Sequence, residues 1–182
     1  VFDLTRLHLG YLCEAAWTQS ETMPLIWMYL AMRHHNSFRC CVSVNDAIAG
    51  FELPAEFHDA PEMQRAIGLA GLVATLCNDL YSYTKELRHG RQPHRNLPTV
   101  VAADEDLPPR EAFLRAVEIH NDTMHAFEAS CFDAAVTHPT PDVARYLRGL
   151  TAWVDGNHHW HATNRDRYSL PDFWPDQRAG TG

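Results

Sequence analysis

Residues 69–86 read LAGLVATLC followed by NDLYSYTKE, an apolar run that changes abruptly into a polar one. The polar half places Asn78, Ser82 and Glu86 four residues apart. An α-helix turns by about 100° per residue, so side chains four positions apart differ by only about 40° and share one stripe. Amide, hydroxyl and carboxylate oxygens are hard ligands that suit Mg²⁺, which also binds phosphate oxygens. With Lys85 beside this stripe, the segment predicts a helix that holds a metal-bound polyphosphate.

Apolar residues recur at three-and-four spacing along most of the chain, which is typical of amphipathic helices. The sequence shows no alternating strand pattern, internal repeat or low-complexity run. Prolines and glycines mark most boundaries between the apolar segments. We expect helices at 3–18, 24–36, 40–50, 61–89, 110–136 and 141–163, a polar connection at 54–61, a loop at 90–98, an acidic turn at 104–109 and a polar tail at about 164–182. The expected fold class is an all-α bundle.

The composition is that of one soluble domain with a core, since 46% of the 182 residues are hydrophobic and 21% are charged. A net charge of −8 argues against nucleic acid and anionic membranes as partners, because both attract basic patches. No apolar run approaches the ~18 residues of a membrane span, and no basic-then-apolar leader opens the chain. The five cysteines follow no Cys-x-x-Cys spacing, which indicates reduced thiols and a cytoplasmic protein.

Two other Asn-Asp pairs act as internal controls for the stripe. Asn45 and Asn121 are followed by no oxygen ligand at the fourth or the eighth later position, whereas Asn78 is followed by one at both. The alternative interpretation of the stripe is an exposed amphipathic helix face without a ligand. Zinc is poorly supported because the twelve histidines form no His-x-x-x-His pair, and we interpret His158 and His161 as solvated or core-edge side chains.

Residues 78–86 resemble the second metal-binding motif of bacterial class I terpene synthases. The resemblance implies a class I terpenoid synthase helical bundle in which Asn78, Ser82 and Glu86 ligate one of three Mg²⁺ ions. It also implies that Lys85 helps to bind the diphosphate of an isoprenoid substrate. The implied enzyme is a terpene cyclase, a carbon–oxygen lyase that ionises and cyclises an allylic isoprenoid diphosphate.

A second match to this family lies near the end of the chain. Arg167 and Tyr168 stand 81 residues beyond Glu86 and are similar to a late Arg-Tyr pair, whose Arg binds diphosphate and whose Tyr hydrogen-bonds nearby. Arg165 is close enough in sequence to compete for that role. Trp160 matches the final helix of the family, where a Trp can line the cavity and shield carbocations; the plainer interpretation is a core side chain.

A third match precedes the stripe. Arg33 lies 45 residues before Asn78 and looks like a diphosphate-sensing Arg at a helix break. Asn36 and Ser37 would then belong to the segment that moves when diphosphate binds. The alternative for Arg33 is a helix-end cation that interacts with the C-terminal dipole.

The resemblance covers nearly the whole chain but only the C-terminal half of the family's domain. Residues 1–182 are therefore expected to form the C-terminal part of a single terpene synthase domain. The family's aspartate-rich first motif, which ligates the other two Mg²⁺ ions, would precede Val1. The acidic residues at 104–106 do not replace it, because they stand in a turn before two prolines. We expect this fragment alone to be inactive.

Within the family, residues 96–101 and 167–174 look most like the bacterial 2-methylisoborneol synthases, which cyclise 2-methylgeranyl diphosphate. A sesquiterpene cyclase acting on farnesyl diphosphate is the alternative inside the family. A chain-elongating prenyltransferase is opposed by the Asn/Ser/Glu stripe, since those enzymes use aspartate-rich motifs in both halves. A non-catalytic helical remnant or interaction bundle is the alternative from another class. The expected partner is the isoprenoid diphosphate, and a homodimer is left open.

Overall fold

The computed structural model describes residues 2–88 and 95–174, and all regular secondary structure in these residues is helical. The helices are α1 (Phe2–Gln19), α2 (Ile26–Arg33), α3 (Arg39–Val42), α4 (Asn45–Ile48), α5 (Ala55–His58), α6 (Pro61–Arg88), α7 (Leu97–Asp104), α8 (Pro109–Thr137) and α9 (Pro141–Thr163). The all-α prediction is therefore confirmed.

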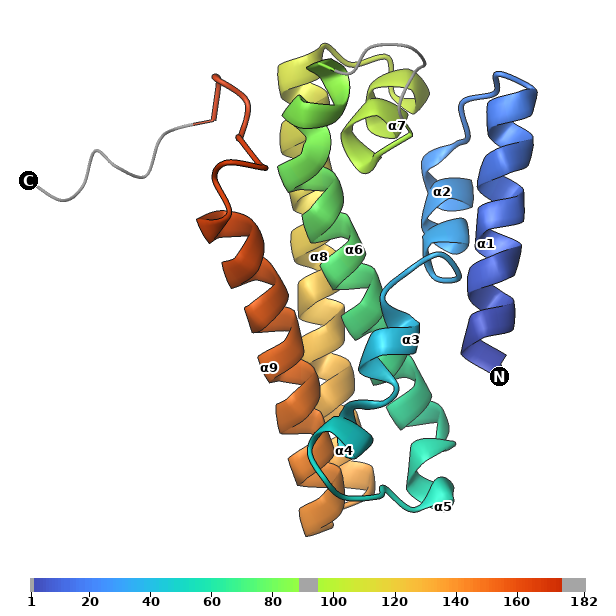
Figure 1. Ribbon diagram of the computed structural model, residues 1–182, viewed down its shortest axis with the longest axis vertical. Helices are drawn as coiled ribbons and strands as arrows, with labels where there is room; N and C mark the ends of the chain where they lie inside the picture. The colour runs from blue at the N-terminus through green and yellow to red at the C-terminus, as the bar shows by residue number, and fades with distance from the viewer. Residues whose placement is uncertain (1, 89–94, 175–182) are drawn as a thin grey trace, which may run out of the picture.

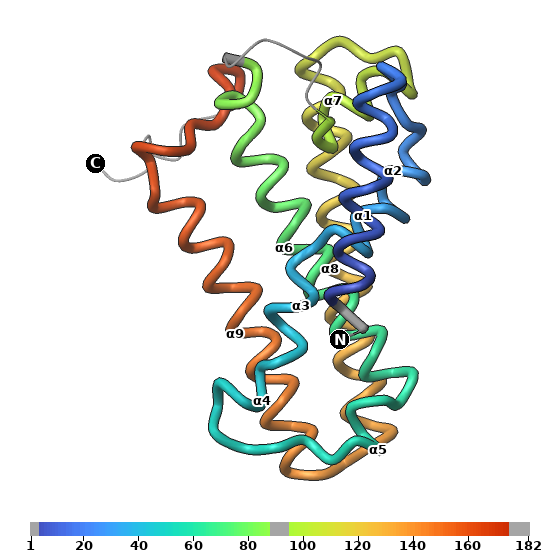
Figure 2. The backbone as a smooth tube through the Cα atoms, turned by 45° about the vertical axis from the view of Figure 1, so that its right-hand side comes forward, coloured from blue at the N-terminus to red at the C-terminus, as the bar shows by residue number. Residues whose placement is uncertain are grey.

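Helix α6 occupies the centre of the bundle; in Figure 1, α8 lies behind it, α9 to its left, and α1 and α2 to its right. Helices α8 and α9 meet at the lower end, and α9 then diverges from α6 toward its own C-terminus (Figure 2). The segment after α9 crosses back toward the C-terminal end of α6, where α7 also lies against α8. The second half of α6 is thus surrounded by α7, by α8 and by the segment after α9.

The apolar run at 69–77 is the buried part of α6: each side chain in it is buried except the half-buried Leu69. Helix α6 contributes to two core clusters, one against the lower parts of α8 and α9 and one against α2, α7 and the start of α8. Phe127 and Tyr146 are fully buried in the first cluster, and Tyr29 and Phe113 in the second. Within 2–88 and 95–174, no helix is both long enough and apolar enough to span a membrane.

The short helices differ most from the prediction. The helix expected at 24–36 ends at Arg33, and the one expected at 40–50 is divided into α3 and α4. The connection at 54–61 contains the single turn α5. Helices of four residues are too short to show a 3.6-residue period, so periodicity did not reveal them.

The loop expected at 90–98 falls partly outside the described residues, and its end is the start of helix α7 rather than a loop. Asn96 caps this helix: its side chain accepts a hydrogen bond from the Thr99 N–H at 3.1 Å, and the Thr99 hydroxyl accepts one from the Asn96 N–H at 3.1 Å. Pro98 then stands in the first turn, where a missing N–H costs no helical hydrogen bond.

The polar tail expected from residue 164 is not a solvated extension over its described part. Tyr168 is only 6% exposed, and the rings of Phe173 and Trp174 lie 5.7 and 5.6 Å from that of Phe113 on α8. These aromatic contacts fix the segment at 164–174 against the bundle.

The segment between α2 and α3 is held close to two helices by glycines. A Cβ on Gly10 of α1 would lie 2.6 Å from the Asn36 Cβ, and one on Gly71 of α6 would lie 2.9 Å from the Arg39 backbone nitrogen. Real Cβ atoms do not approach other atoms so closely. The absence of side chains at Gly10 and Gly71 therefore lets this segment sit between α1 and α6.

Candidate metal and diphosphate site

The three stripe residues lie on successive turns of α6. Ser82 is buried at 3% exposure, and Asn78 and Glu86 are half-buried. The Ser82 hydroxyl donates a hydrogen bond to Glu86 Oε1 at 2.8 Å, so two of the three predicted ligands are in contact with each other. A helix face turned freely to solvent would not bury the central serine, and the geometry disfavours that alternative.

Glu86 is held on its other side by the start of α7. The Asn96 Nδ2 group donates to Glu86 Oε2 at 2.7 Å, while Asn96 Oδ1 caps the helix. Asn96 is 1% exposed, so both of its functions are shielded from water. Sequence reasoning did not assign Asn96 to the site. Its signal was the capping pattern Asn-x-x-Thr beside a proline, which indicates a helix start close to the motif.

Asn78, at the other end of the stripe, is in contact with α9. Its Nδ2 lies 2.9 Å from His161 Nε2, and His161 Nδ1 lies 2.8 Å from the Asn157 carbonyl oxygen. One turn away, the Tyr81 hydroxyl lies 3.3 Å from His158 Nε2. His161 is 2% exposed, so our interpretation of it as a solvated or core-edge histidine was incomplete: it is buried against the predicted metal ligand.

Asp79 is the most buried acid near the stripe, with 1% of its surface exposed. It forms an ion pair with Arg33, and its Oδ2 accepts hydrogen bonds from the Tyr29 hydroxyl at 2.6 Å and the Leu97 N–H at 3.2 Å. Burial raises the pKa of the Asp79 carboxyl, an effect opposed by the charge of Arg33 and the hydrogen bonds from Tyr29 and Arg33. Sequence reasoning missed Asp79 because its partners are 46 and 50 residues away.

Arg33 remains a strong cation at this position. Burial by itself would lower the pKa of Arg33, but the charge of Asp79, the charge of Tyr29 and the hydrogen bonds to both together outweigh burial, and the pKa is raised. The Arg33 Nε–H donates to the Tyr29 hydroxyl at 2.9 Å, and one Nη2–H serves Asp79. A guanidinium carries five N–H donors, so these two bonds leave donors for an anion.

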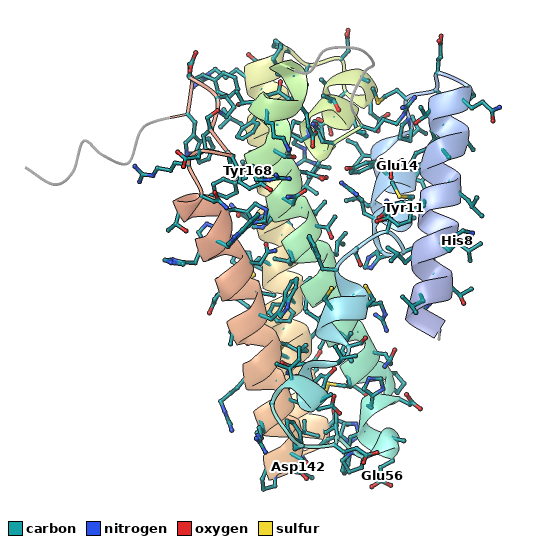
Figure 3. The ribbon with its side chains drawn as sticks, viewed as in Figure 1. His8, Tyr11, Glu14, Glu56, Asp142 and Tyr168 are labelled. Carbon is teal, nitrogen blue, oxygen red and sulfur yellow. The ribbon has the colours of Figure 1, made fainter. Side chains whose placement is uncertain are left out.

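The segment after α9 brings the other predicted diphosphate residues to α6. Arg167 Nε donates to the Tyr168 hydroxyl at 2.9 Å, and the Lys85 ammonium lies 5.9 Å from the centre of the Tyr168 ring. Tyr168, labelled in Figure 3, lies beside α6 in that view. The structure thus brings Lys85, Arg167 and Tyr168 together from two distant parts of the chain. Arg165 and Arg167 are both exposed, and of the two it is Arg167 that contacts Tyr168.

Asn36 and Ser37 lie apart from the stripe, in the segment that follows α2. Both are buried; Asn36 Nδ2 donates to Glu14 Oε2 at 2.7 Å, and Ser37 Oγ accepts from the Arg39 N–H at 3.2 Å. Glu14 of α1 is on the opposite side of α6 from Tyr168 in Figure 3. Trp160 is 47% exposed, with its ring edge-to-face against His161 at 4.9 Å and Tyr168 at 5.5 Å.

The donor set of the stripe fits Mg²⁺. Its three side chains offer oxygen only, with a single carboxylate, which matches a hard ion that keeps water and phosphate in its shell. In the described part of the chain, no group of three or more His, Cys, Asp and Glu residues forms a softer metal site. The arrangement can hold a cation while leaving positions for anionic oxygens, with Lys85 on the same helix and Arg33 and Arg167 on neighbouring segments.

Known proteins share the sequence and fold of this chain. Residues 3–126 match the model of terpene synthase family 2, C-terminal metal binding. The chain is 57% identical over 173 residues to a 2-methylisoborneol synthase from Streptomyces ambofaciens, covering 94% of this chain and 39% of the relative. It is 26% identical over 168 residues to a (+)-T-muurolol synthase from Streptomyces clavuligerus, covering 89% and 40% of the two chains.

A solved structure gives the same correspondence in three dimensions. It is the crystal structure of 2-methylisoborneol synthase from Streptomyces coelicolor A3(2) in complex with Mg²⁺ and 2-fluorogeranyl diphosphate. The TM-score is 0.92 at 56% identity, covering 95% of this chain and 55% of that one. The chain therefore spans about two fifths to a little over half of the length of these relatives.

Proposed function

The chain belongs to terpene synthase family 2, and from this membership we propose that it is the C-terminal part of a single terpene synthase domain that acts with Mg²⁺. The proposed reaction ionises and cyclises an allylic isoprenoid diphosphate. The observation that supports the proposal is the stripe of three oxygen-bearing side chains on α6. Basic side chains lie on two other segments, Arg33 at the end of α2 and Arg167 in the segment after α9.

Asn78, Ser82 and Glu86 are the proposed ligands of one Mg²⁺, and two further ions would be held by an aspartate-rich motif outside these 182 residues. When bound, Mg²⁺ neutralises the negative charge that grows on the diphosphate as the allylic carbon–oxygen bond breaks. Ser82 and Asn96 orient the Glu86 carboxylate from both sides, so the ligand geometry exists before a cation arrives.

The basic side chains are proposed to bind the diphosphate. Arg33 and Arg167 are each held by a tyrosine hydroxyl, which directs their guanidinium groups. Lys85 adds a third positive charge on α6 itself. Asn36 and Ser37 would take part when the segment after α2 responds to the bound diphosphate.

Trp160 is the proposed aromatic wall of the cavity. Its indole ring lies in the last turn of α9, next to the ring of Tyr168. An aromatic face stabilises a cation without reacting with it, and the stabilisation increases when water is excluded.

We further propose 2-methylgeranyl diphosphate as the substrate and 2-methylisoborneol as the product, with diphosphate as the leaving group and water as the source of the hydroxyl. The much higher identity to the 2-methylisoborneol synthase than to the T-muurolol synthase supports this choice over farnesyl diphosphate. A sesquiterpene cyclase is the alternative within the family.

The test is to incubate the full-length protein with Mg²⁺ and, in turn, geranyl, 2-methylgeranyl and farnesyl diphosphate, and to analyse the volatile products. We expect a cyclised methylated alcohol from 2-methylgeranyl diphosphate only. Asn78→Ala and Glu86→Gln should each abolish the product, because each removes an oxygen ligand needed for ionisation. Asn121→Ala, in the exposed Asn-Asp pair of α8, is the matched control and should retain it.

Two outcomes would contradict the proposal. Undiminished product from both α6 variants would refute the metal assignment. No product from any diphosphate, with the protein folded and Mg²⁺ present, would favour the non-catalytic helical bundle instead.

A further inference from the structure

His161 has contacts on both nitrogens of its ring although only 2% of its surface is exposed. On one side Nδ1 lies 2.8 Å from the Asn157 carbonyl oxygen in the preceding turn of α9. On the other side Nε2 lies 2.9 Å from Nδ2 of Asn78 on α6. A buried imidazole placed between a backbone carbonyl and a side-chain amide has only one neutral arrangement that satisfies both neighbours.

The arrangement follows from which atoms can donate. A carbonyl oxygen only accepts, so the ring proton must be on Nδ1 and point at Asn157. Nε2 then carries a lone pair and can only accept, so the Asn78 atom that faces it must be the NH₂ group. The ring therefore determines the orientation of the Asn78 amide, and the carbonyl oxygen Oδ1 is the amide atom left for the metal.

The ring itself is held in place by three aromatic side chains. Its centre lies 4.9 Å from that of Trp160, 5.0 Å from that of Tyr168 and 5.6 Å from that of Tyr81. These residues belong to α9, to the segment after it and to α6. Rotation of the imidazole would require these rings to move, so its two hydrogen bonds are fixed in direction.

We infer that His161 is a positioning residue for Asn78: it accepts a hydrogen bond from the amide NH₂ and so presents the amide oxygen to Mg²⁺. The inference rests on the proposed function, since it needs Asn78 to be a ligand. It adds to that function a contact from α9, which carries no proposed ligand. Partners of this kind commonly account for a 10–100-fold difference in metal affinity.

The first test measures binding rather than turnover. Mg²⁺ and inorganic diphosphate are titrated into the full-length protein in a calorimeter. His161→Phe, which keeps an aromatic ring but has no acceptor, should bind them at least about tenfold more weakly than the unaltered protein. His161→Gln should retain most of the affinity, because its Oε1 can accept the same hydrogen bond. His159→Phe, at an exposed position of α9, is the matched control and should bind like the unaltered protein.

Asn78→Ala distinguishes an error in the metal assignment from an error in the role given to His161. If this variant binds Mg²⁺ and diphosphate normally, the metal assignment in the proposed function is wrong. If it binds weakly while His161→Phe behaves like His159→Phe, the metal site stands and the role given to His161 is refuted.

A second measurement needs no variant and so does not depend on whether His161→Phe folds. Nitrogen-15 NMR of the histidine rings in the unaltered protein distinguishes the two neutral tautomers. We expect the His161 proton on Nδ1. A proton on Nε2 would leave that nitrogen unable to accept from the Asn78 amide and would overturn the inference.

Discussion

The ion pair between Asp79 and Arg33 gives the sharpest test of the packing around the site. The perturbation is Asp79→Asn, which keeps the shape of the side chain but removes its charge. Two unit charges about 4 Å apart interact by about 4 kcal/mol at an effective dielectric constant of about 20. Removing one partner of a buried ion pair costs about 3–5 kcal/mol. The Arg33 side chain is 15% exposed, so water can solvate part of the charge that Asp79→Asn leaves unpaired. We therefore expect the unfolding free energy to fall by about 3 kcal/mol, the lower end of this range.

A loss of this size is easy to measure. For a chain of this length a change of 1 kcal/mol shifts Tm by about 2–4 °C, so Asp79→Asn should lower Tm by about 6–12 °C. Urea unfolding followed by circular dichroism should show a lower midpoint with an unchanged slope, since the surface exposed on unfolding stays the same. Asp122→Asn is the control, because Asp122 is the exposed acid of another Asn-Asp pair, and its effect should stay within about 0.5 kcal/mol.

A double variant shows whether the effect belongs to the pair. Once Arg33→Met has removed the positive charge, Asp79→Asn should cost less than it does alone, by at least about 1 kcal/mol. If Asp79→Asn unfolds at the same midpoint as Asp122→Asn, or if the two changes at the pair are additive, the charges are not coupled and the reasoning fails.

Three further predictions concern other contacts. Asn96→Ser should keep the helix cap but lose the hydrogen bond to the Glu86 carboxylate, lowering the unfolding free energy by about 1.5–3 kcal/mol in urea titrations; no loss in Asn96→Ser beside a clear loss in Asn96→Ala would show that only the cap matters. Gly10→Ala should destabilise by about 1–3 kcal/mol, because the new Cβ meets a side-chain carbon at 2.6 Å, whereas Gly156→Ala, in open space on α9, should raise Tm slightly. Burial lowers the pKa of His120 below its ordinary value of 6.5, so the folded state disfavours its protonation; stability should fall as the pH drops below about 6.5, less steeply in His120→Gln, and equal slopes would contradict this.

The long helices could be predicted because each repeats the 3.6-residue period over several turns, and α6, α8 and α9 also begin at a proline. The shared face of Asn78, Ser82 and Glu86 was equally predictable, since spacing along one helix decides which side chains lie together. In contrast, α7 was hidden because Pro98 looks the same in a loop and in the first turn of a helix. Only the capping of Asn96 by Thr99 separates the two cases.

The side chains that support the stripe could not be predicted in the same way. Asp79 meets Arg33 across 46 residues, and Asn78 meets His161 across 83. Such contacts depend on how helices pack, which a local pattern does not describe. Part of the signal was present: a carboxylate two positions after nine mostly apolar residues must find a partner if the helix is buried.

The position of Asp79 has a consequence for the order in which the protein assembles. Its carboxylate joins α6 to Arg33 at the end of α2 and to the backbone at the start of α7. A lone carboxylate resists leaving water, so α6 cannot be covered at this point before Arg33 arrives. We therefore expect α2 to dock on α6 in a single concerted step of folding. Kinetic φ-values, the ratios of the change in folding activation energy to the change in stability, should be equal for mutations at Arg33 and Asp79. The buried Asp79 carboxylate would thereby make α2, α6 and the start of α7 fold together, although they are far apart in the chain.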